Sequence, residues 1–580
     1  MVDRRLIDRA RAWIALHADP ADRAALQGAV AAAEEGNDAE LVDLVEGGLR
    51  FGTAGLRGPL GPGPRRMNAV VAAQMAAAIA RVLLREDPDA AARGVLVGRD
   101  ARHGSADMAA AAIDAFTAHG FDVITFDGPV PTPLVASELA HGDAAAAIVV
   151  TASHNPPADN GIKVYWTFGA QIVPPVDTQI AGEIAAISSA MERAALDDPD
   201  GSSAAAVLHP AGVTPGTTSG AGASSSGPAA DAYVRRAVEG RSGRSGTVPL
   251  ALSSLHGVGA DLLERVLRAS GHHDLHVVEA QRDPDPDFPT VAFPNPEEPG
   301  ALDLLLEIAE RQRCVAGLAN DPDADRLAVV ARAADGSWHP LTGDQIGAAL
   351  CHHLLGESRA LDDGRDLLVA TTVVSSQLAP SIAAAAGAHV AETLTGFKWL
   401  CRPGMEHPEW RQVLAYEEAL GYAVGDGTRD KDGITAALAF ADLLTRLAAE
   451  GRTVFDLLAD LDRRHGAHVT RNGWTTLAGP EAAAHLAATV QRLADQPPAE
   501  LGCKPVVRTD RPAPDVLRMW TDQGTRVAIR ASGTEPKLKH YCEAVVPVEG
   551  SSDEALAAAR TKARRRLDDA VTALRELLGT

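Results

Sequence analysis

The feature that most constrains the fold is a repeated alternation of short apolar strand patterns with helical patterns between residues 94 and 465. Strands separated by helical segments imply parallel or mixed sheets that are covered by helices. The alternation begins with GVLVGRD and AAAIVVTASHN, restarts at TVPLALSSL, closes on RCVAGLANDPDADRLAVVA, and restarts again at DLLVATTVVSS. From about residue 466 the pattern changes to several strands with two long helices. We therefore expect three α/β units followed by a C-terminal α+β domain.

The segment between residues 197 and 230 interrupts this pattern, because it is rich in Gly, Ser, Ala and Pro and has almost no large apolar side chains. Such a segment cannot bury enough apolar surface to offset its ordering entropy, so we expect a flexible insert there. The chain is then divided as follows: α/β domains at 1–200, 231–340 and 341–465, the flexible insert at 201–230, and the α+β domain at 466–580.

Charge and composition limit the kinds of partner that the protein can bind and the compartment in which it is expected to act. The chain carries 77 acidic and 54 basic side chains, and its formal charge of −23 argues against binding to nucleic acid or to anionic membranes. No run of 18 apolar residues occurs, so we expect no membrane span. The N-terminus lacks a signal-peptide pattern, and five cysteines are scattered singly. These features predict a cytoplasmic protein with reduced thiols and without a zinc site.

Lysine is scarce, with seven residues against 47 arginines, so each retained lysine is informative. A compact ammonium can shift its pKa or point at one phosphate oxygen, which a guanidinium does less readily. Five of the seven fall in segments rich in glycine and charge: Lys163, Lys398, Lys431, Lys537 and Lys539.

Ser153 follows the apolar strand AAAIVV in the sequence TASHNPP. Ligands of open α/β sheets bind beyond the carboxyl ends of the strands, so this hydroxyl is displayed where chemistry tends to occur. The two prolines after it stiffen the loop. An ordinary strand-to-helix turn with a capping serine is the alternative interpretation of this loop taken alone.

Three carboxylates, Asp321, Asp323 and Asp325, occupy alternate positions after another expected strand. Side chains two residues apart in an extended loop project on the same side, so the three can converge on one hard cation. A calcium loop is excluded, because the required Gly and Glu are missing from its sixth and twelfth positions. Magnesium with a phosphate oxygen among its ligands fits better, and Arg326 adds a phosphate-binding guanidinium. A solvated acidic turn is the alternative.

Further loops suggest phosphate and sugar binding. RASGTEPK combines two cations, two hydroxyls and a glycine, as phosphate-binding loops do, with a hairpin turn as the alternative. TLTGFK and YEEALG both follow strands of the third unit, and the carboxylate of Glu417 can accept hydrogen bonds from sugar hydroxyls. Paired acids on a solvated loop are the alternative there. The Gly-rich FGTAGLRG carries Arg57 but matches neither a P-loop nor a dinucleotide motif.

Taken together and in order, FGTAGLRG, TASHNPPADNGIKVYW, DPDADR, TLTGFKW with YEEALGY, and RASGTEPKLKHY resemble the α-D-phosphohexomutase superfamily. The resemblance extends from about residue 50 to about residue 545. HGVG at 256–259 and PDFPTVAFPNPEE at 286–298 are similar to the branch of bacterial phosphoglucomutases and the phosphoglucomutase-2/phosphopentomutase type. The resemblance implies four domains in a heart-shaped arrangement around a central cleft: phosphoserine-bearing, metal-binding, sugar-binding and phosphate-binding.

The resemblance also implies roles for individual residues. Ser153 would carry the transferable phosphate and, with Asp321, Asp323 and Asp325, bind one Mg²⁺ per chain. Lys163 is the candidate general acid/base, because a lysine among cations titrates nearer neutrality. The candidate catalytic residues are Ser153, Arg57, Lys163 and His154. The candidate substrate-binding residues are Arg326, Thr395, Gly396, Lys398, Glu417 and Lys431. The residues expected to grip the non-reacting phosphate are Arg530, Ser532, Gly533, Thr534 and Lys537.

The activity implied is intramolecular phosphoryl transfer between the 1- and 6-positions of glucose phosphate, and possibly mannose phosphate, with a sugar bisphosphate as intermediate and activator. Many family members have a serine where Ala419 stands, so a phosphopentomutase acting on the 1- and 5-positions is an alternative. An aspartyl-phosphate transferase with Asp321 as nucleophile and a non-catalytic sugar-phosphate-binding protein are the others. The expected partner is a small-molecule sugar phosphate, and the expected state is a monomer or weak homodimer.

Overall fold

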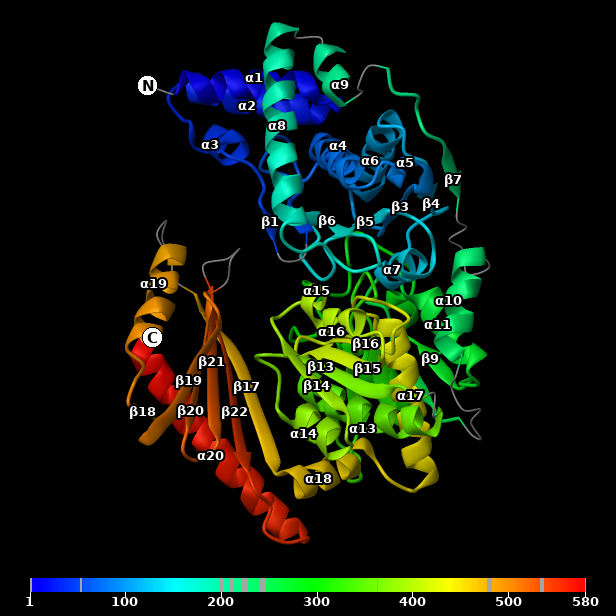
Figure 1. Ribbon diagram of the computed structural model, residues 1–580, viewed down its shortest axis with the longest axis vertical. Helices are drawn as coiled ribbons and strands as arrows, with labels where there is room; N and C mark the ends of the chain where they lie inside the picture. Colours follow the sequence, from blue (N-terminus) through cyan, green and yellow to red (C-terminus); the bar gives the residue numbers. More distant parts are fainter. Residues whose placement is uncertain are drawn as a thin grey trace. The chain divides into compact units, whose positions relative to one another are not determined.

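The structure is a computed structural model in which the chain forms two compact units (Figure 1). It describes residues 3–52, 55–198, 202–208, 212–220, 227–239, 247–361, 364–476, 482–531 and 537–578. The first unit comprises Met1–Gly243, Pro249–Ala328 and Gly427–Leu438, and the second comprises Arg244–Val248, Val329–Asp426 and Ala439–Thr580. The expectation of three α/β units and an α+β tail is confirmed. None of the helices in the described ranges is long and apolar enough to cross a membrane.

The first α/β unit is built on a seven-stranded sheet of order β1-β2-β6-β5-β3-β4-β7. β3 pairs in parallel with β4 and β5, whereas β6 runs antiparallel to β5. β5 reads AAIVV and is buried at every position, as a central strand of such a sheet should be. The strands are β1 (Phe51–Gly52), β2 (Gly55–Pro59), β3 (Val95–Arg99), β4 (Val123–Thr125), β5 (Ala146–Val150), β6 (Asp159–Tyr165) and β7 (Thr218–Gly220).

Alanine-rich helices pack around this sheet. α4 is buried along most of its length, because its small side chains let α6 and α8 approach closely. Asn68 caps α4 by accepting a hydrogen bond from the backbone N–H of Val71. The helices are α1 (Arg4–Leu16), α2 (Pro20–Glu34), α3 (Ala39–Val45), α4 (Ala69–Glu86), α5 (Ala90–Arg93), α6 (Ser105–Ala118), α7 (Thr132–His141), α8 (Val176–Asp197) and α9 (Ser202–Leu208).

The structure differs from the expected flexible insert in the part of residues 197–230 that it describes. Residues 202–208 form α9, and β7 pairs in parallel with β4 at the edge of the first sheet. Asp122 anchors this strand by accepting hydrogen bonds from the backbone N–H and the hydroxyl of Thr217, at 2.9 and 2.5 Å. Backbone pairing of this kind needs no large side chains, which is why composition failed to predict it.

The second α/β unit has the parallel strands β8 (Leu250–Ser253), β9 (Leu275–Val277) and β10 (Ala316–Ala319), with β8 in the middle. Its helices are α10 (Pro228–Val238), α11 (Ala260–Ala269), the short 3₁₀ helix η1 (Glu279–Gln281) and α12 (Asp303–Arg311). α11 is amphipathic and buries Leu263, Val266 and Leu267. The loop after β10 therefore starts from the carboxyl end of a buried parallel strand.

The third α/β unit lies in the second compact unit and has a four-stranded sheet of order β14-β13-β15-β16. The strands are β13 (Asp366–Thr372), β14 (His389–Thr393), β15 (Trp410–Glu417) and β16 (Gly421–Val424). The hairpin of β11 (Ala328–Arg332) and β12 (Trp338–Pro340) belongs instead to the sheet of the second α/β unit, whose strand order is β12-β11-β10-β8-β9. Its helices are α13 (Gly343–Leu361), α14 (Leu378–Ala385), α15 (Phe397–Leu400), α16 (Arg402–Glu406), α17 (Gly433–Ala449) and α18 (Val454–His465). The YEEALGY motif is the hairpin turn between β15 and β16.

The α+β tail has an antiparallel sheet of order β17-β22-β21-β20-β19-β18, whose apolar face packs against α20. Sequence patterns predicted β17, β20 and β21, but β19 and β22 carry many polar residues and were missed. The strands are β17 (Ala467–Thr476), β18 (Glu500–Leu501), β19 (Lys504–Ala513), β20 (Val516–Thr521), β21 (Thr525–Ala531) and β22 (Lys537–Val546). The helices are α19 (Ala482–Asp495) and α20 (Asp553–Leu578).

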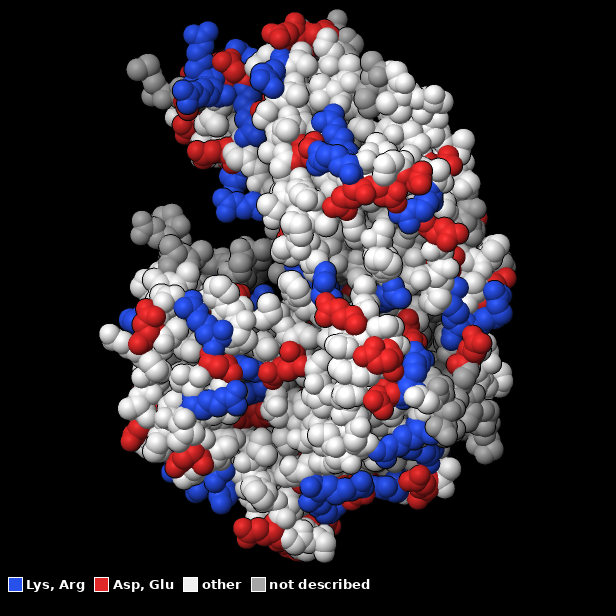
Figure 2. Space-filling model, in the orientation of Figure 1, with Lys and Arg blue, Asp and Glu red and all other residues white. Residues whose placement is uncertain are grey.

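Acidic and basic side chains are interspersed over the face of the molecule seen in Figure 2. That face shows no extended region of a single charge sign, although the formal charge of the chain is −23. The net charge therefore does not prevent cations from concentrating locally at a binding site.

Candidate functional site

Ser153 lies just beyond the carboxyl end of β5 and is only 2% exposed to solvent. Its φ of 53° is in the left-handed region, which a non-glycine residue adopts only when its surroundings hold it there. The backbone N–H of Ser153 donates to the hydroxyl of Thr151 at 2.9 Å. Its own hydroxyl donates to Oδ2 of Asp321 at 2.7 Å. The serine is thus held against the first carboxylate of the DPDADR loop.

Arg102 fixes the loop that carries Ser153, and sequence reasoning missed it. Its guanidinium donates to the carbonyl oxygens of Ser153, Asn155 and Pro156 at 2.7, 2.6 and 2.8 Å. Arg102 is buried, and Asp100 lies 3.4 Å from its Nε. The signal in the sequence was the polar stretch RDARHGS after β3, a strand next to β5.

The carboxylates of Asp321, Asp323 and Asp325 converge in the loop after β10. Each residue is 0% exposed, and one oxygen from each lies within 4.8 Å of the others. Within the described part of the chain, Oδ1 of Asp323 and of Asp325 accept no hydrogen bond. Buried carboxylate oxygens without donors are costly, and hard divalent cations prefer such oxygens as ligands. The residues present therefore fit a Mg²⁺ ion.

The HGVG turn at residues 256–259 packs against the DPDADR loop. A Cβ on Gly257 would lie 2.4 Å from backbone atoms of Pro322, and one on Gly259 would lie 2.7 Å from the Cβ of Ala324. The backbone N–H of Val258 donates to the carbonyl of Pro322 at 2.8 Å. The glycines are needed because the two backbones touch here.

Lys163 on β6 lies between two of these carboxylates, with Nζ 2.6 Å from Oδ2 of Asp323 and 2.5 Å from Oδ2 of Asp325. Burial disfavours its charged form, but the two carboxylates outweigh burial and raise the pKa of Lys163. The expectation that this pKa falls toward neutrality is therefore wrong for this arrangement. Its nearest charged neighbours are acids, with Lys431 a weaker opposing cation.

Asp321 and His154 show the electrostatic consequences of burial beside Ser153. Burial, followed by the charges of Asp325 and Asp323, raises the pKa of Asp321 to about 8. Burial also lowers the pKa of His154 well below its ordinary value, and nearby arginines add to this effect. Nδ1 of His154 lies 3.2 Å from the Ser153 hydroxyl. Because the Ser153 hydroxyl proton goes to Asp321, a neutral imidazole with its proton on Nδ1 can donate to the Ser153 oxygen.

Lys431, the basic residue expected beside the sugar-reading loops, belongs to the first compact unit, where it lies beside the carboxylates. Its Nζ is 3.2 Å from Oδ2 of Asp325 and 3.3 Å from Oδ1 of Asp430. Asp430 is fixed by the hydroxyl of Tyr165 and the amide of Gln171, which donate at 2.6 and 2.7 Å. Sequence spacing could not place Lys431, because its segment belongs to a different compact unit from its neighbours in the chain.

Two arginines and one threonine complete the surroundings of the carboxylates. Arg57 on β2 is half-buried, and desolvation lowers its pKa, while Asp323 is the carboxylate that favours its charge most. The backbone N–H of Arg326 donates to Oδ1 of Asp321 at 3.0 Å. Thr132, the first residue of α7, was not anticipated, and its hydroxyl donates to Oδ2 of Asp323 at 2.6 Å. These contacts fix the carboxylates that a cation would bind.

The second compact unit brings together residues from two other motifs. The guanidinium of Arg530 donates to the hydroxyl of Thr395, and its Nε lies 3.2 Å from Oδ2 of Asp515. Gly396 next to Thr395 has a φ of 106°, which favours glycine. Lys398 is buried in α15, Glu417 ends β15 and Lys537 begins β22. The expected site residues Ser532, Gly533 and Thr534 lie outside the described residues.

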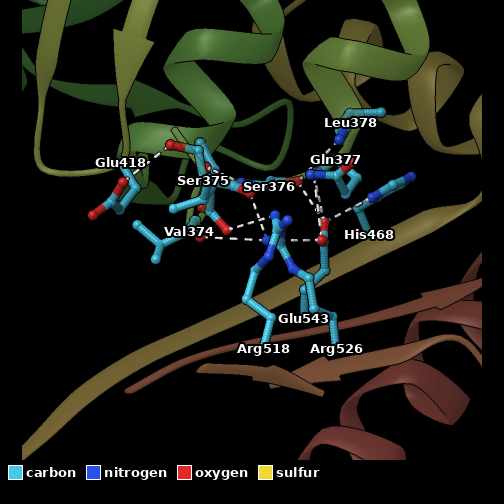
Figure 3. A network of polar contacts seen from close by, with 12 residues as sticks. Val374, Ser375, Ser376, Gln377, Leu378, Glu418, His468, Arg518, Arg526 and Glu543 are labelled. Carbon is cyan, nitrogen blue, oxygen red and sulfur yellow. Dashed lines mark hydrogen bonds and ion pairs between the residues drawn. The ribbon is translucent and has the colours of Figure 1, made fainter. Parts of the chain in front are cut away.

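Glu543 is the centre of a buried polar network between the loop after β13 and the tail sheet (Figure 3). Oε1 of Glu543 accepts hydrogen bonds from the hydroxyl of Ser376 at 2.6 Å and from the backbone N–H of Gln377 at 3.0 Å. His468 and Arg526 approach the same carboxylate at 2.9 and 3.2 Å. The hydrogen bonds of His468 and Ser376 and the charge of Arg526 outweigh burial, so the pKa of Glu543 is lowered.

The same network reaches the hairpin of YEEALGY. Arg526 donates to the carbonyl of Ser375 at 2.5 Å, and the Ser375 hydroxyl donates to Oε2 of Glu418 at 3.0 Å. Burial and the neighbouring charge of Glu417 raise the pKa of Glu418 to about 7. The loop 373–377, which we call the strap, therefore joins the YEEALGY hairpin to the tail sheet (Figure 3).

A serine hydroxyl held against three convergent carboxylates, on three α/β units with an α+β tail, is an arrangement suited to phosphoryl transfer. The chain belongs to the phosphoglucomutase/phosphomannomutase family, and all four domain models of that family match it. They match at residues 48–191 (α/β/α domain I), 231–336 (domain II), 342–464 (domain III) and 480–565 (C-terminal domain). It is thus an intramolecular phosphotransferase.

Named relatives cover most of the chain. A Schizosaccharomyces pombe protein named "Probable phosphoribomutase" is 34% identical over 536 residues, 87% of this chain and 88% of that protein. The phosphopentomutase of Homo sapiens is 31% identical, covering 93% of this chain and 91% of that protein. A crystal structure of a phosphoglucomutase/phosphomannomutase family protein from Burkholderia thailandensis has the same fold. Its TM-score is 0.63 at 23% identity, with 89% of this chain and 97% of that chain covered.

Proposed function

We propose that the enzyme moves a phosphoryl group between the 1- and 6-positions of glucose phosphate, and of mannose phosphate, through a phosphoserine at Ser153. The phosphoserine gives its phosphoryl group to the free hydroxyl of the sugar phosphate, and the resulting bisphosphate returns its other phosphoryl group to Ser153. The observation that carries the proposal is the 2.7 Å hydrogen bond from the Ser153 hydroxyl to Asp321 inside the buried carboxylate triad.

The residues of the first compact unit have distinct roles in this proposal. Asp321, Asp323 and Asp325 would hold one Mg²⁺, which supplies stabilisation of negative charge on the transferring phosphoryl group. Arg57 and Arg326 add positive charge around the same group, and Arg102 holds the serine loop in position. Lys163 would give the proton on its Nζ to the oxygen that loses the phosphoryl group and would take up the proton released by the attacking hydroxyl. The imidazole of His154 can donate a hydrogen bond to the Ser153 oxygen. Lys431 supports the charge balance next to Asp325.

The residues of the second compact unit would hold the rest of the substrate. Thr395, Gly396, Lys398 and Glu417 are proposed to bind the sugar. A separate cradle is proposed to hold the phosphate that does not react: Arg530, Ser532, Gly533, Thr534 and Lys537. The hydrogen bond between Arg530 and Thr395 supports a shared function for the two groups. Separate grips for sugar and phosphate suit a bisphosphate that must bind in two orientations.

A pentose phosphate is the second candidate substrate. Ala419 lacks the hydroxyl that many family members place in the sugar loop, and three relatives above 30% identity are named phosphoribomutase or phosphopentomutase. Measuring kcat/KM for glucose 1-phosphate, mannose 1-phosphate and ribose 1-phosphate, each with its bisphosphate as activator, decides between them. We expect the hexose phosphates to be preferred by at least tenfold. A tenfold preference for ribose 1-phosphate would replace the first candidate by the second.

The phosphoenzyme tests the mechanism itself. Intact-mass and phosphopeptide analysis of the isolated enzyme should find acid-stable phosphate on Ser153. A hydroxylamine-labile phosphate on Asp321, with none on Ser153, would favour the aspartyl-phosphate transferase instead. We also propose that the protein acts in the cytoplasm on small-molecule sugar phosphates alone, as a monomer or weak homodimer.

A further inference from the structure

The segment 285–298, between η1 and α12, carries the motif PDFPTVAFPNPEE, to which the proposed function gives no role. Phe288 in this segment contacts two residues that come from different α/β units. One is Arg102, which holds the loop of Ser153, and the other is His256, in the HGVG turn that packs against the DPDADR loop. These contacts all lie within the first compact unit. Phe288 therefore links the supports of the two loops that meet at the serine hydroxyl.

The loops that meet at this hydroxyl come from different α/β units, and packing between segments has to place them against each other. The hydrogen bond from Ser153 to Asp321 joins residues 168 positions apart. Each segment that meets here contains a non-glycine residue with φ in the left-handed region: 53° at Ser153, 58° at His256 and 60° at Ala324. Such residues keep these angles only when surrounding contacts hold them there. The position of the serine relative to the carboxylates therefore depends on contacts from outside its own loop.

The guanidinium of Arg102 is the contact through which Phe288 reaches the serine loop. Its two terminal nitrogens donate to carbonyl oxygens of that loop, and its Nε lies 3.4 Å from Asp100. Cζ of Arg102 lies over the ring of Phe288, 4.9 Å from the ring centre, which is within the range of a cation–π interaction. The two residues are only 4% and 3% exposed, so water does not weaken this attraction. The ring therefore limits the positions that the guanidinium can take while it holds the loop.

Phe288 is itself fixed to the HGVG turn. Its φ of 48° is rare for a bulky residue and requires contacts that hold it. The ring meets the imidazole of His256 edge-on, with the ring centres 6.5 Å apart. The backbone N–H of Asp285 donates to the carbonyl of His256 at 3.0 Å, and Nε2 of His256 lies 2.8 Å from the hydroxyl of Thr290. The ring that Arg102 contacts is thus anchored on both sides in the sequence to the turn beneath the carboxylate loop.

We propose that Phe288 is a positioning residue for phosphoryl transfer: it holds Arg102, and through Arg102 it holds the loop of Ser153 in place against the carboxylate loop. This inference rests on the proposed function, because it names a residue that would place the serine for that reaction. Its loss should lower kcat rather than raise KM. The serine acts in the transfer step, whereas the residues proposed to bind the sugar and the second phosphate belong to the other compact unit.

The first test is Phe288→Leu, which keeps a buried apolar side chain and removes the aromatic ring. We expect kcat for glucose 1-phosphate and for ribose 1-phosphate to fall about tenfold, while KM changes less than twofold. Asp287→Asn is the matched control, because Asp287 is the neighbouring residue and its contact with His103 joins two exposed side chains. A kcat equal to that of the control would overturn the inference, and so would a loss confined to KM.

Action through Arg102 is tested by combining two changes. Arg102→Lys keeps the charge but loses the planar set of donors that binds several carbonyl oxygens at once, so kcat should fall about a hundredfold. The variant that carries both Arg102→Lys and Phe288→Leu should have a kcat within threefold of Arg102→Lys alone, because the ring then has no guanidinium to hold. Losses that multiply would show that Phe288 affects turnover by another route, and the positioning role would be wrong.

Hydrogen exchange of the backbone measures the serine loop without any turnover. The N–H groups of Ser153 and Asn155 donate within this loop at 2.9 and 3.1 Å, so their exchange with solvent reports its opening. In Phe288→Leu the peptide that covers residues 152–160 should exchange at least fivefold faster than in Asp287→Asn. Peptides from α4 and α8 should exchange at the same rate in both variants. Faster exchange in all three peptides would mean a general loss of stability and would contradict the positioning role.

The exchange measurement also separates this inference from the proposed function. If the unchanged enzyme turns over no sugar phosphate but the difference at residues 152–160 is found, the proposed activity fails and the hold of Phe288 on the serine loop stands. If turnover is normal while exchange of this peptide agrees between Phe288→Leu and Asp287→Asn, the positioning role fails and the proposed activity stands.

Discussion

At the scale of single residues, the carboxylates beside Ser153 have different neighbours, and their pKa values therefore differ. Asp323 receives Lys163 and Thr132, which outweigh burial and hold its pKa below the usual range. Asp321 receives the hydroxyl of Ser153 but lies beside two other acids, so its pKa is raised. A divalent cation would relieve the repulsion among the three, and Asp323 is the acid that is most firmly ionised before it binds.

Asp323→Asn should therefore raise the Mg²⁺ concentration that gives half-maximal activity, because one of the three charges that hold the ion is lost. We expect a shift of at least tenfold in a magnesium titration of activity, together with a lower maximal rate. Asp287→Asn is the matched control, since Asp287 is an exposed acid of the same compact unit. A variant whose magnesium titration matches that of the control would contradict the three-carboxylate site.

Asp344 gives a prediction about pH and stability. Burial raises its pKa to about 6, although the backbone N–H of Ser376 donates to it. The folded state therefore binds this proton more tightly than the unfolded state, and the stabilisation present below pH 4 is lost as the pH rises through about 6. Asp344→Asn keeps an acceptor for Ser376 without a charge. It should increase the free energy of unfolding by about 1–3 kcal/mol at pH 8 and by nothing at pH 4.

Chemical denaturation of the two proteins at pH 4, 6 and 8 measures this difference. The gain must grow between pH 4 and pH 8, because the unchanged protein loses stability over that interval while the amide does not titrate. A gain of the same size at every pH would mean that packing around residue 344, and not its ionisation, accounts for the effect.

At the scale of secondary-structure elements, loops that follow strands position most of the candidate site. The DPDADR loop is supported by the HGVG turn, where Gly257 touches the backbone of Pro322. Gly257→Ala should force the two backbones apart, at a cost of about 1–3 kcal/mol in stability. Because the loop bears the carboxylates, the magnesium requirement should rise and kcat/KM should fall by at least tenfold.

The control for this variant is Gly182→Ala on α8, where an added Cβ meets nothing within 4 Å. Alanine is also the better helix former, so Gly182→Ala should leave kcat/KM unchanged and the unfolding temperature equal or higher. If Gly257→Ala behaved in the same way, the turn would have no part in placing the carboxylates.

The sequence predicted those elements whose pattern lies within one short segment of the chain. An apolar strand followed by a polar loop identified the positions of Ser153 and of the three aspartates, and the strand patterns gave three α/β units and the tail. It did not predict Arg102 or Thr132, because their partners lie 51 and 191 residues away. The contact between Arg530 and Thr395 joins residues 135 positions apart, which no single segment encodes. The pKa of Lys163 depended likewise on neighbours brought from another domain.

At the scale of the whole molecule, the candidate site residues divide between the two compact units: Ser153 and its carboxylates belong to the first, and Arg530 and Thr395 belong to the second. This separation implies a division of labour. In the proposed function, the first unit would perform the phosphoryl transfer, and the second would hold the substrate in the same way before and during transfer. The formal charge of −23 is compatible with both of these roles, because charges of the two signs are interspersed on the face seen in Figure 2.

Arg530→Ala tests that division, because it removes a cation from the second unit and leaves the residues around Ser153 intact. An interaction present in ground and transition states alike affects KM more than kcat. We expect a loss of about 1.5–3 kcal/mol in kcat/KM, the range of a charge-assisted hydrogen bond, with KM carrying the larger part. Some loss of kcat should accompany it, since the same contact aligns the substrate.

The phosphorylation of Ser153 and a matched control complete this experiment. The fraction of Ser153 that carries phosphate should stay near that of the unchanged enzyme, because Arg530 lies in the other unit. Arg564→Ala on α20 removes an exposed arginine from the same domain and should change neither KM nor kcat. If Arg530→Ala instead kept its KM and lost its kcat, Arg530 would act at the transferring phosphoryl group. The assignment of transfer to one unit and of grip to the other would then have to be reversed.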